Sequence, residues 1–168
     1  AHNLDMVFFK IITIFFIFIV SYNNINAKDL MFENFDNQKK VQWKFITDQV
    51  MGGVSTGKVE FLNDNNNFYA RMRGNVSTDN KGGFIQVRRK LEKLNLEGSK
   101  FIEIIAKGNN QNYFIHLRTS GTFLPWQYYQ ISFKVLDSFE TFKLPISEFK
   151  RSSVFLSKRI NPKNITSI

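Results

Sequence analysis

Cysteine is absent from the sequence, and histidine occurs only twice in 168 residues. Without cysteine the chain has no disulfide, no thiolate nucleophile and no zinc–thiolate site. His2 lies in the N-terminal leader described below, which leaves His116 as the single candidate base and excludes a histidine-rich metal centre. Paired carboxylates for glycoside hydrolysis are not indicated, because no spacing brings two of Asp48, Glu60 and Asp79 together. The sequence therefore predicts no enzyme activity, no catalytic residue, no metal and no cofactor.

Basic residues are plentiful, with a net charge of +9, but no basic run is interleaved with aromatic residues. They are scattered except at residues 88–90, so we expect no nucleic-acid partner. Residues 52–58 fit the spacing G-x-x-x-x-G-K, but a phosphate-binding loop needs Ser or Thr next, and the sequence has Val59. Residues 58–62 also alternate like a strand rather than opening a helix. Nucleotide binding is therefore not predicted.

The N-terminus has the pattern of an export signal. Lys10 precedes an apolar run at residues 11–20, followed by polar residues and the small Ala27. The run is shorter than the roughly 20 residues of a membrane-spanning helix, which favours a leader over residues 1–27 that is cleaved after Ala27 and directs export to the periplasm or outside. Residues 1–5, before Met6, are interpreted as upstream read-through or a fragment edge. Counting residues 7–9 in the run gives the alternative of an uncleaved membrane anchor, the one route by which we expect membrane contact.

Residues 28–168 form one expected domain made of short strands. Tyr113, Ile115 and Leu117 alternate with Phe114, His116 and Arg118, so the two sets should face opposite sides of a strand. The nearly continuous apolar run at residues 101–106 predicts a strand in the middle of a sandwich, and residues 68–73 and 84–89 are expected to pair as a hairpin. Further strands are expected at residues 127–133 and 139–144. With no long amphipathic helix, this pattern predicts an all-β sandwich.

The most unusual stretch is residues 43–57, in which Asp48 is followed by the pair Gly52 and Gly53. Adjacent glycines supply positive φ or permit close approach of another group, so a shaped loop is expected. Asp48 would either accept backbone N–H groups and tie the loop or contact a ligand. A second polar cluster invites the same two interpretations, with the candidate residues Asn80, Gly82 and Gly83.

Two other groups of candidate binding residues lie later in the chain. If His116 and Arg118 share a sheet face, they offer a place for an anion or a sugar hydroxyl, although a strand histidine without a partner motif is more often structural. Trp126, Tyr128 and Tyr129 follow Pro125. Such aromatics either form a platform for sugar rings or anchor the core and its loops.

Several short motifs resemble those of the NADH:ubiquinone oxidoreductase (complex I) intermediate-associated protein family. The specific one is TDQVMGGVS at residues 47–55, in which Gln49 departs from the family's small or acidic residue. Weaker matches follow in the family's order at residues 74–77, 81–84, 117–119, 129–133 and 144–149. The resemblance covers about residues 32–168.

This resemblance implies a jelly-roll β-sandwich of the galactose-binding-like kind, related to carbohydrate-binding modules. It also implies a non-enzymatic assembly role through a protein partner. An exported carbohydrate-binding module with a glycan partner is the alternative. Family members continue past the equivalent of residues 165–168, so the resemblance implies a chain truncated at its C-terminal end, with at least one more strand after Ile168.

Overall fold

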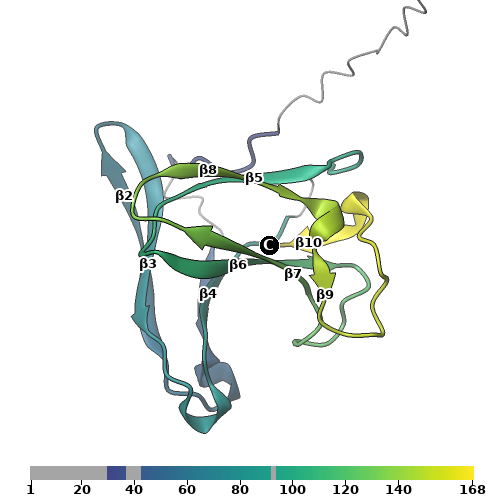
Figure 1. Ribbon diagram of the computed structural model, residues 1–168, viewed down its shortest axis with the longest axis horizontal. Coiled ribbons are helices and arrows are strands. Elements are labelled where there is room, and N and C mark those ends of the chain that lie inside the picture. The colour runs from purple at the N-terminus through teal and green to yellow at the C-terminus, as the bar shows by residue number, and fades with distance from the viewer. Residues whose placement is uncertain (1–29, 37–42, 92–93) are drawn as a thin grey trace, which may run out of the picture. The chain divides into compact units, whose positions relative to one another are not determined.

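A computed structural model describes residues 30–36, 43–91 and 94–168 of the chain (Figure 1). The chain divides into two units, Ala1–Leu30 and Met31–Ile168, and the second unit holds every strand described below. The expected leader and its cleavage site at Ala27 lie outside the described residues. In the described part of the chain, no helix is both long and apolar enough to cross a membrane.

The second unit is all-β, as the sequence predicted. Its strands are β1 (Lys44–Thr47), β2 (Thr56–Asp64), β3 (Asn67–Asn75), β4 (Ile85–Arg88), β5 (Phe101–Ala106), β6 (Gln111–Thr119), β7 (Tyr129–Val135), β8 (Glu140–Pro145), β9 (Lys150–Arg151) and β10 (Ile165–Ser167). Short 3₁₀ turns connect some of them: η2 (Asp48–Met51), η3 (Asp79–Lys81), η4 (Ile146–Glu148) and η5 (Pro162–Asn164).

One sheet runs through six of the strands. β10, β6, β7 and β9 are neighbours in that order, and β1 pairs with β4. The chain just after β4 lies along β10, because the N–H of Leu91 donates to the Thr166 carbonyl at 2.9 Å and Arg89 exchanges two backbone hydrogen bonds with Ile168. The order β1-β4-β10-β6-β7-β9 is therefore continuous, and Figure 1 marks the C-terminal end beside β10. We call this the six-stranded sheet.

The remaining strands form two antiparallel pairs, β2 with β3 and β5 with β8. β3 was expected to form a hairpin with residues 84–89, and that prediction was wrong: β4 pairs with β1 instead. Asp64 pairs with Asn67, so only Asn65 and Asn66 connect β2 to β3, and both have positive φ. This is the connection that matches the twist of a two-stranded ribbon, so the short loop determines the pairing.

The core is formed by side chains from most of these strands. Leu117 is completely buried and Tyr129 is 2% exposed, in a cluster that also contains Leu144, Phe149 and Ile165. The alternation predicted for residues 113–118 is confirmed, with Leu117 inward and Phe114 outward. The prediction that residues 101–106 form a central strand was wrong in one respect. β5 pairs with β8 alone among the described strands, and its Phe101 and Ile105 face outward at 46% and 66% exposure.

Candidate functional site

A buried carboxylate ties together the two loops that the sequence marked. Asp48 has no exposed surface. Its oxygens accept hydrogen bonds from the backbone N–H groups of Ser55 at 2.9 Å, Gly83 at 2.6 Å and Phe84 at 3.3 Å, and from the Ser55 hydroxyl. We call this group of four residues the Asp48 knot. Of the two roles left open for Asp48, the structure shows the loop-tying one, because none of its surface is available to a partner.

Glycine is required around the knot for two different physical reasons. Gly52 and Gly83 have positive φ, +89° and +136°, which side chains rarely adopt. Gly53 and Gly82 lie against the carboxylate instead: a Cβ on Gly53 would lie 2.4 Å from Asp48 Cγ, and one on Gly82 2.4 Å from Asp48 Oδ2. Asn80, in the same loop, has a φ of 54° and is exposed. These residues therefore shape the loops rather than line a cavity.

Hydrogen bonding keeps Asp48 ionised. Burial raises the pKa of its carboxyl, but the hydrogen bonds from Ser55, Gly83 and Phe84 outweigh burial and bring the pKa below its usual 3.8. On the β2–β3 pair, hydrogen bonds from Lys58 and, to a smaller extent, from Arg73 lower the pKa of the Glu60 carboxyl to about 2. Both groups bind protons more weakly in the folded protein than in the unfolded chain.

This predicts an acid-labile fold. A carboxyl whose pKa is depressed on folding contributes stability above its unfolded pKa and loses it as pH falls through the folded value. The free energy of unfolding should therefore decrease as pH falls from 4.5 towards 2. Urea unfolding at a series of pH values measures this.

Two variants separate the carboxyls. In Asp48→Asn the free energy of unfolding should depend less on pH between 4.5 and 2, because the titrating group is gone. Glu60→Gln should change this pH dependence less, because Glu60 lies among exposed basic side chains, where ion pairs contribute little. The same loss of stability at low pH in Asp48→Asn as in wild type would contradict this account.

A second feature is a loop between β6 and β7 that polar side chains hold in place. The Arg118 guanidinium donates to the carbonyls of Thr122, Leu124 and Pro125 at 3.0–3.1 Å. The Gln127 side-chain oxygen accepts the N–H groups of Phe123 and Leu124 at 2.9 and 3.1 Å. Arg118, predicted as a binding residue, is therefore placed as the brace of this loop.

The loop after β9 is fastened to the same structure. The Ser152 hydroxyl accepts the N–H of Tyr128 at 3.0 Å and donates to the Trp126 carbonyl at 2.8 Å, joining the two loops. Arg151 donates to the carbonyls of Val154 and Leu156 at 2.9 and 2.6 Å. Both loops are thus held by side chains whose partners are backbone groups.

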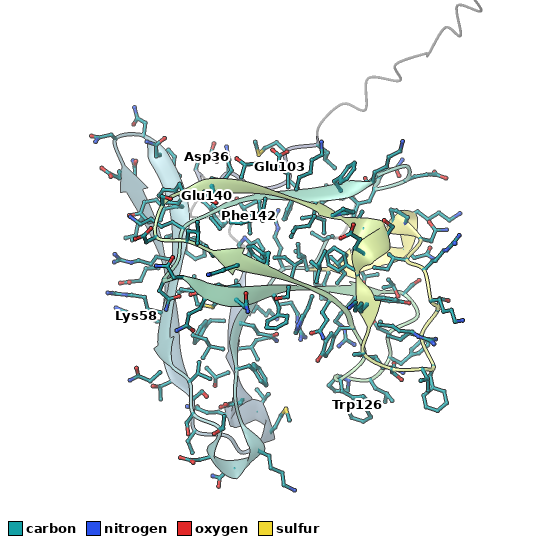
Figure 2. All side chains as sticks on the ribbon, in the orientation of Figure 1. Asp36, Lys58, Glu103, Trp126, Glu140 and Phe142 are labelled. Atoms are coloured by element: carbon teal, nitrogen blue, oxygen red, sulfur yellow. The ribbon has the colours of Figure 1, made fainter. Side chains whose placement is uncertain are left out.

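These two loops display large apolar side chains to solvent. The exposed fractions are 84% for Phe123, 42% for Leu124, 63% for Trp126, 75% for Val154 and 88% for Phe155. We call these five residues the apolar loop patch. Figure 2 shows Trp126 at the outer end of the loop between β6 and β7. Sequence reasoning singled out only Trp126. The available signal was apolar residues beside turn formers, Gly121 and Thr122 in one loop and Ser152 and Ser153 in the other.

A third group lies on the face of the six-stranded sheet opposite the core. The His116 and Tyr128 rings are stacked, with centroids 4.1 Å apart and planes inclined by 12°. Burial lowers the pKa of His116, a hydrogen bond with Gln130 raises it and the charge of Arg88 lowers it, so the net shift is downward. Arg118 projects from the same face of β6, as predicted. The prediction of Tyr129 as a binding residue was wrong. Tyr129 belongs to the core, and its hydroxyl donates to the Ser157 carbonyl at 3.0 Å.

The titratable side chains of these features are engaged by neighbouring groups. In the part of the chain that the structure describes, no three His, Asp or Glu side chains gather where they would hold a metal ion. Asp48 is saturated with hydrogen bonds, and His116 has an amide and a phenol ring as neighbours. The exposed side chains of the apolar loop patch and of the His116 face are mostly apolar, aromatic or cationic.

The fold defines the class of protein as a jelly-roll β-sandwich. A solved structure with this fold is a family 11 carbohydrate-binding module of the cellulosomal cellulase Lic26A-Cel5E of Clostridium thermocellum. The two share 17% sequence identity and superpose with a TM-score of 0.59, over 82% of this chain and 81% of that one. At this identity the likeness shows the fold alone.

The sequence places the chain within that class more narrowly. Residues 32–168 match the family described as complex I intermediate-associated protein 30 (CIA30), and the chain belongs to this family. Among curated proteins, none matches it significantly. Membership confirms the family resemblance noted in the sequence and suggests a role related to complex I assembly. The strand expected after Ile168 stays a prediction.

Proposed function

We propose that this protein is a non-enzymatic binding module that acts in complex I assembly by holding a protein partner on its apolar loop patch. The observation that carries the proposal is the exposure of Phe123, Trp126 and Phe155, each above 60%, on two adjoining loops. Aromatic side chains of this kind contribute most of the binding energy in protein interfaces when a partner covers them. Leaving several together in water costs free energy that a partner would recover.

The fastened backbone supports the same conclusion. Loop ordering is one of the main costs of association, and it is reduced when the loop is already fixed. The backbone that carries the patch residues is held by side-chain hydrogen bonds from Arg118, Gln127, Arg151 and Ser152. The patch is thus presented in one arrangement before any partner arrives, as expected of a docking surface.

The test is copurification from the protein's own cells. We expect tagged wild-type chain to bring down subunits of NADH:ubiquinone oxidoreductase or its assembly intermediates, identified by mass spectrometry. The double variant Phe123→Ser and Phe155→Ser should reduce their recovery roughly tenfold or more, because each removes a large contact residue.

The matched control is Val50→Ser with Met51→Ser. These residues are 73% and 68% exposed, on the loop of the Asp48 knot. Their replacement removes similar apolar surface elsewhere and should leave recovery unchanged. Recovery that depends on Val50 and Met51 instead would move the docking surface to that loop, where a hollow of about 490 Å³ lies beside Val50. Absence of complex I subunits in every pull-down would refute the proposal.

A second candidate function is glycan binding, favoured by a separate observation. The Phe114, His116 and Tyr128 rings form a row on the open face of the six-stranded sheet, with Phe114 55% exposed. Trp126 stands at the end of the neighbouring loop. Aromatic rings with polar neighbours are the arrangement on which sugar rings stack. The likeness in fold to a carbohydrate-binding module supports the same candidate.

A further inference from the structure

The strands of the six-stranded sheet contain no acidic residue. Across β1, β4, β10, β6, β7 and β9 there is no Asp or Glu, whereas the acidic residues that lie in described strands are all on β2, β5 or β8. Figure 2 shows two of these, Glu103 and Glu140, far from Trp126. Among the described strands, the acidic residues are therefore confined to the two antiparallel pairs outside the six-stranded sheet.

Basic side chains gather on the outer face of that sheet. Lys44 pairs with Arg88, and Lys150 pairs with Gln130, so each pair projects from the same side. Ser167 pairs with Lys90 on one edge and Arg118 on the other, which continues the face of β4 into that of β6. Burial is the main cause of the lowered pKa of His116 and of Arg118, and the charge of Arg88 nearby lowers both further.

Three of these cations, Lys44, Arg88 and Lys150, have no acidic ion-pair partner in the described part of the chain. The ion pairs there join Glu60 to residues of β2 and β3, and Glu33 to Arg89. None reaches Lys44, Arg88 or Lys150. Arg88 is also half-buried, a position in which an unmatched charge is costly. A bound anion would remove that cost.

The same face is built to take a sugar beside the anion. Each ring on β6 has a hydrogen-bonding side chain opposite it on β7: Ser132 opposite Phe114, and Gln130 opposite His116. Residues two apart along a strand are separated by about 6.6 Å, which is the scale of one sugar ring. The apolar face of a sugar can lie on Phe114 while its hydroxyls reach Ser132 and Gln130.

We propose that the outer face of the six-stranded sheet binds an acidic oligosaccharide, with sugar rings along Phe114 and His116 and a sugar carboxylate on Arg88. This deepens the glycan-binding candidate and rests on it. A single-stranded nucleic acid would bring the same negative charge, so the titrations below include one to separate it from an acidic sugar. The requirement for charge distinguishes this site from one for neutral glucans.

The test is calorimetric titration of the full chain with two matched oligosaccharides. One is a galacturonate oligosaccharide, and the other is the same molecule with its carboxylates reduced to alcohols. We expect the acidic form to bind at least about tenfold more tightly, the scale of one charged hydrogen bond. The preference should shrink as salt is raised.

Variants assign the effect to the face. Arg88→Gln should remove most of the preference, Arg88→Lys should retain it, and Phe114→Ser should weaken both forms. Lys143→Gln removes one positive charge from β8 and should change neither affinity. If Arg88→Gln does not fold, the salt dependence and the Arg88→Lys variant still decide.

The outcomes separate the two claims. Equal affinity for both oligosaccharides would leave glycan binding standing and overturn the requirement for acid. Binding of neither would overturn both. Equally tight binding of an oligothymidylate of the same charge would show attraction to any polyanion, and would overturn the claim of sugar recognition.

Discussion

Replacement of Asp48 by alanine is expected to lower the melting temperature by roughly 10 °C or more. The carboxylate is fully buried and is the acceptor for backbone N–H groups of Ser55, Gly83 and Phe84. Alanine has no acceptor, so these donors lose their partner and a space opens between two loops. Thermal unfolding followed by circular dichroism at neutral pH measures the change.

Two controls interpret the result. Asp79→Ala removes an exposed carboxylate from the neighbouring η3 turn and should shift the melting temperature by only a degree or two. Asp48→Asn keeps the shape but turns an N–H₂ group towards backbone donors, so it should be nearly as unstable as the alanine variant. A melting temperature for Asp48→Ala equal to that of Asp79→Ala would show that the knot does not stabilise the fold.

The second large effect is expected at the glycines that touch this carboxylate. Gly53→Ala and Gly82→Ala should each cost about 3 kcal/mol, because the new Cβ meets Asp48, which its hydrogen bonds hold in place. Gly52→Ala should cost only about 1 kcal/mol, since its Cβ would meet nothing within 4 Å and only positive φ opposes it. Denaturant unfolding gives all three values.

A double-mutant cycle tests the cause. If the clash with the carboxylate is the source, adding Gly82→Ala to Asp48→Ala should cost much less than adding it to wild type, because the two atoms within 3.0 Å of its new Cβ are Asp48 Oδ2 and Cγ, which alanine lacks. Gly52→Ala should cost the same in both backgrounds, because it does not touch Asp48. Additive effects for Gly82 would contradict the close-contact explanation and point to backbone conformation instead.

Local patterns were sufficient for the alternating strands but not for their pairing. β6 was predicted because inward Leu117 and outward Phe114 follow a period of two, which a strand imposes on its own. The hairpin error arose because pairing depends on non-local contacts: the N–H of Gly83 is bound by a carboxylate 35 residues earlier in the chain. That contact carries the chain between β3 and β4 to Asp48.

The sequence was sufficient to single out several residues of the candidate site, but not to say what each of them does there. Asp48 and its glycines were recognised because charge beside paired glycines is rare in a plain loop, yet whether the carboxylate faced inward depended on donors elsewhere in the chain. Tyr129 and Trp126 show the same limit, since neighbouring aromatics went to opposite environments, one buried and one exposed. Phe123 and Phe155 went unnoticed because a pair of apolar residues in a loop is too short to show a periodicity.

The position of β10 also affects how the protein folds. Residues 165–168 lie between the chain following β4 and β6, although both neighbours precede them by long stretches of sequence. Such non-local pairing slows folding, because a large loop must close before the contacts form. Until β10 inserts, β4 and β6 each present an open edge, which invites pairing between molecules. Aggregation during refolding should therefore depend on how soon this short strand is captured.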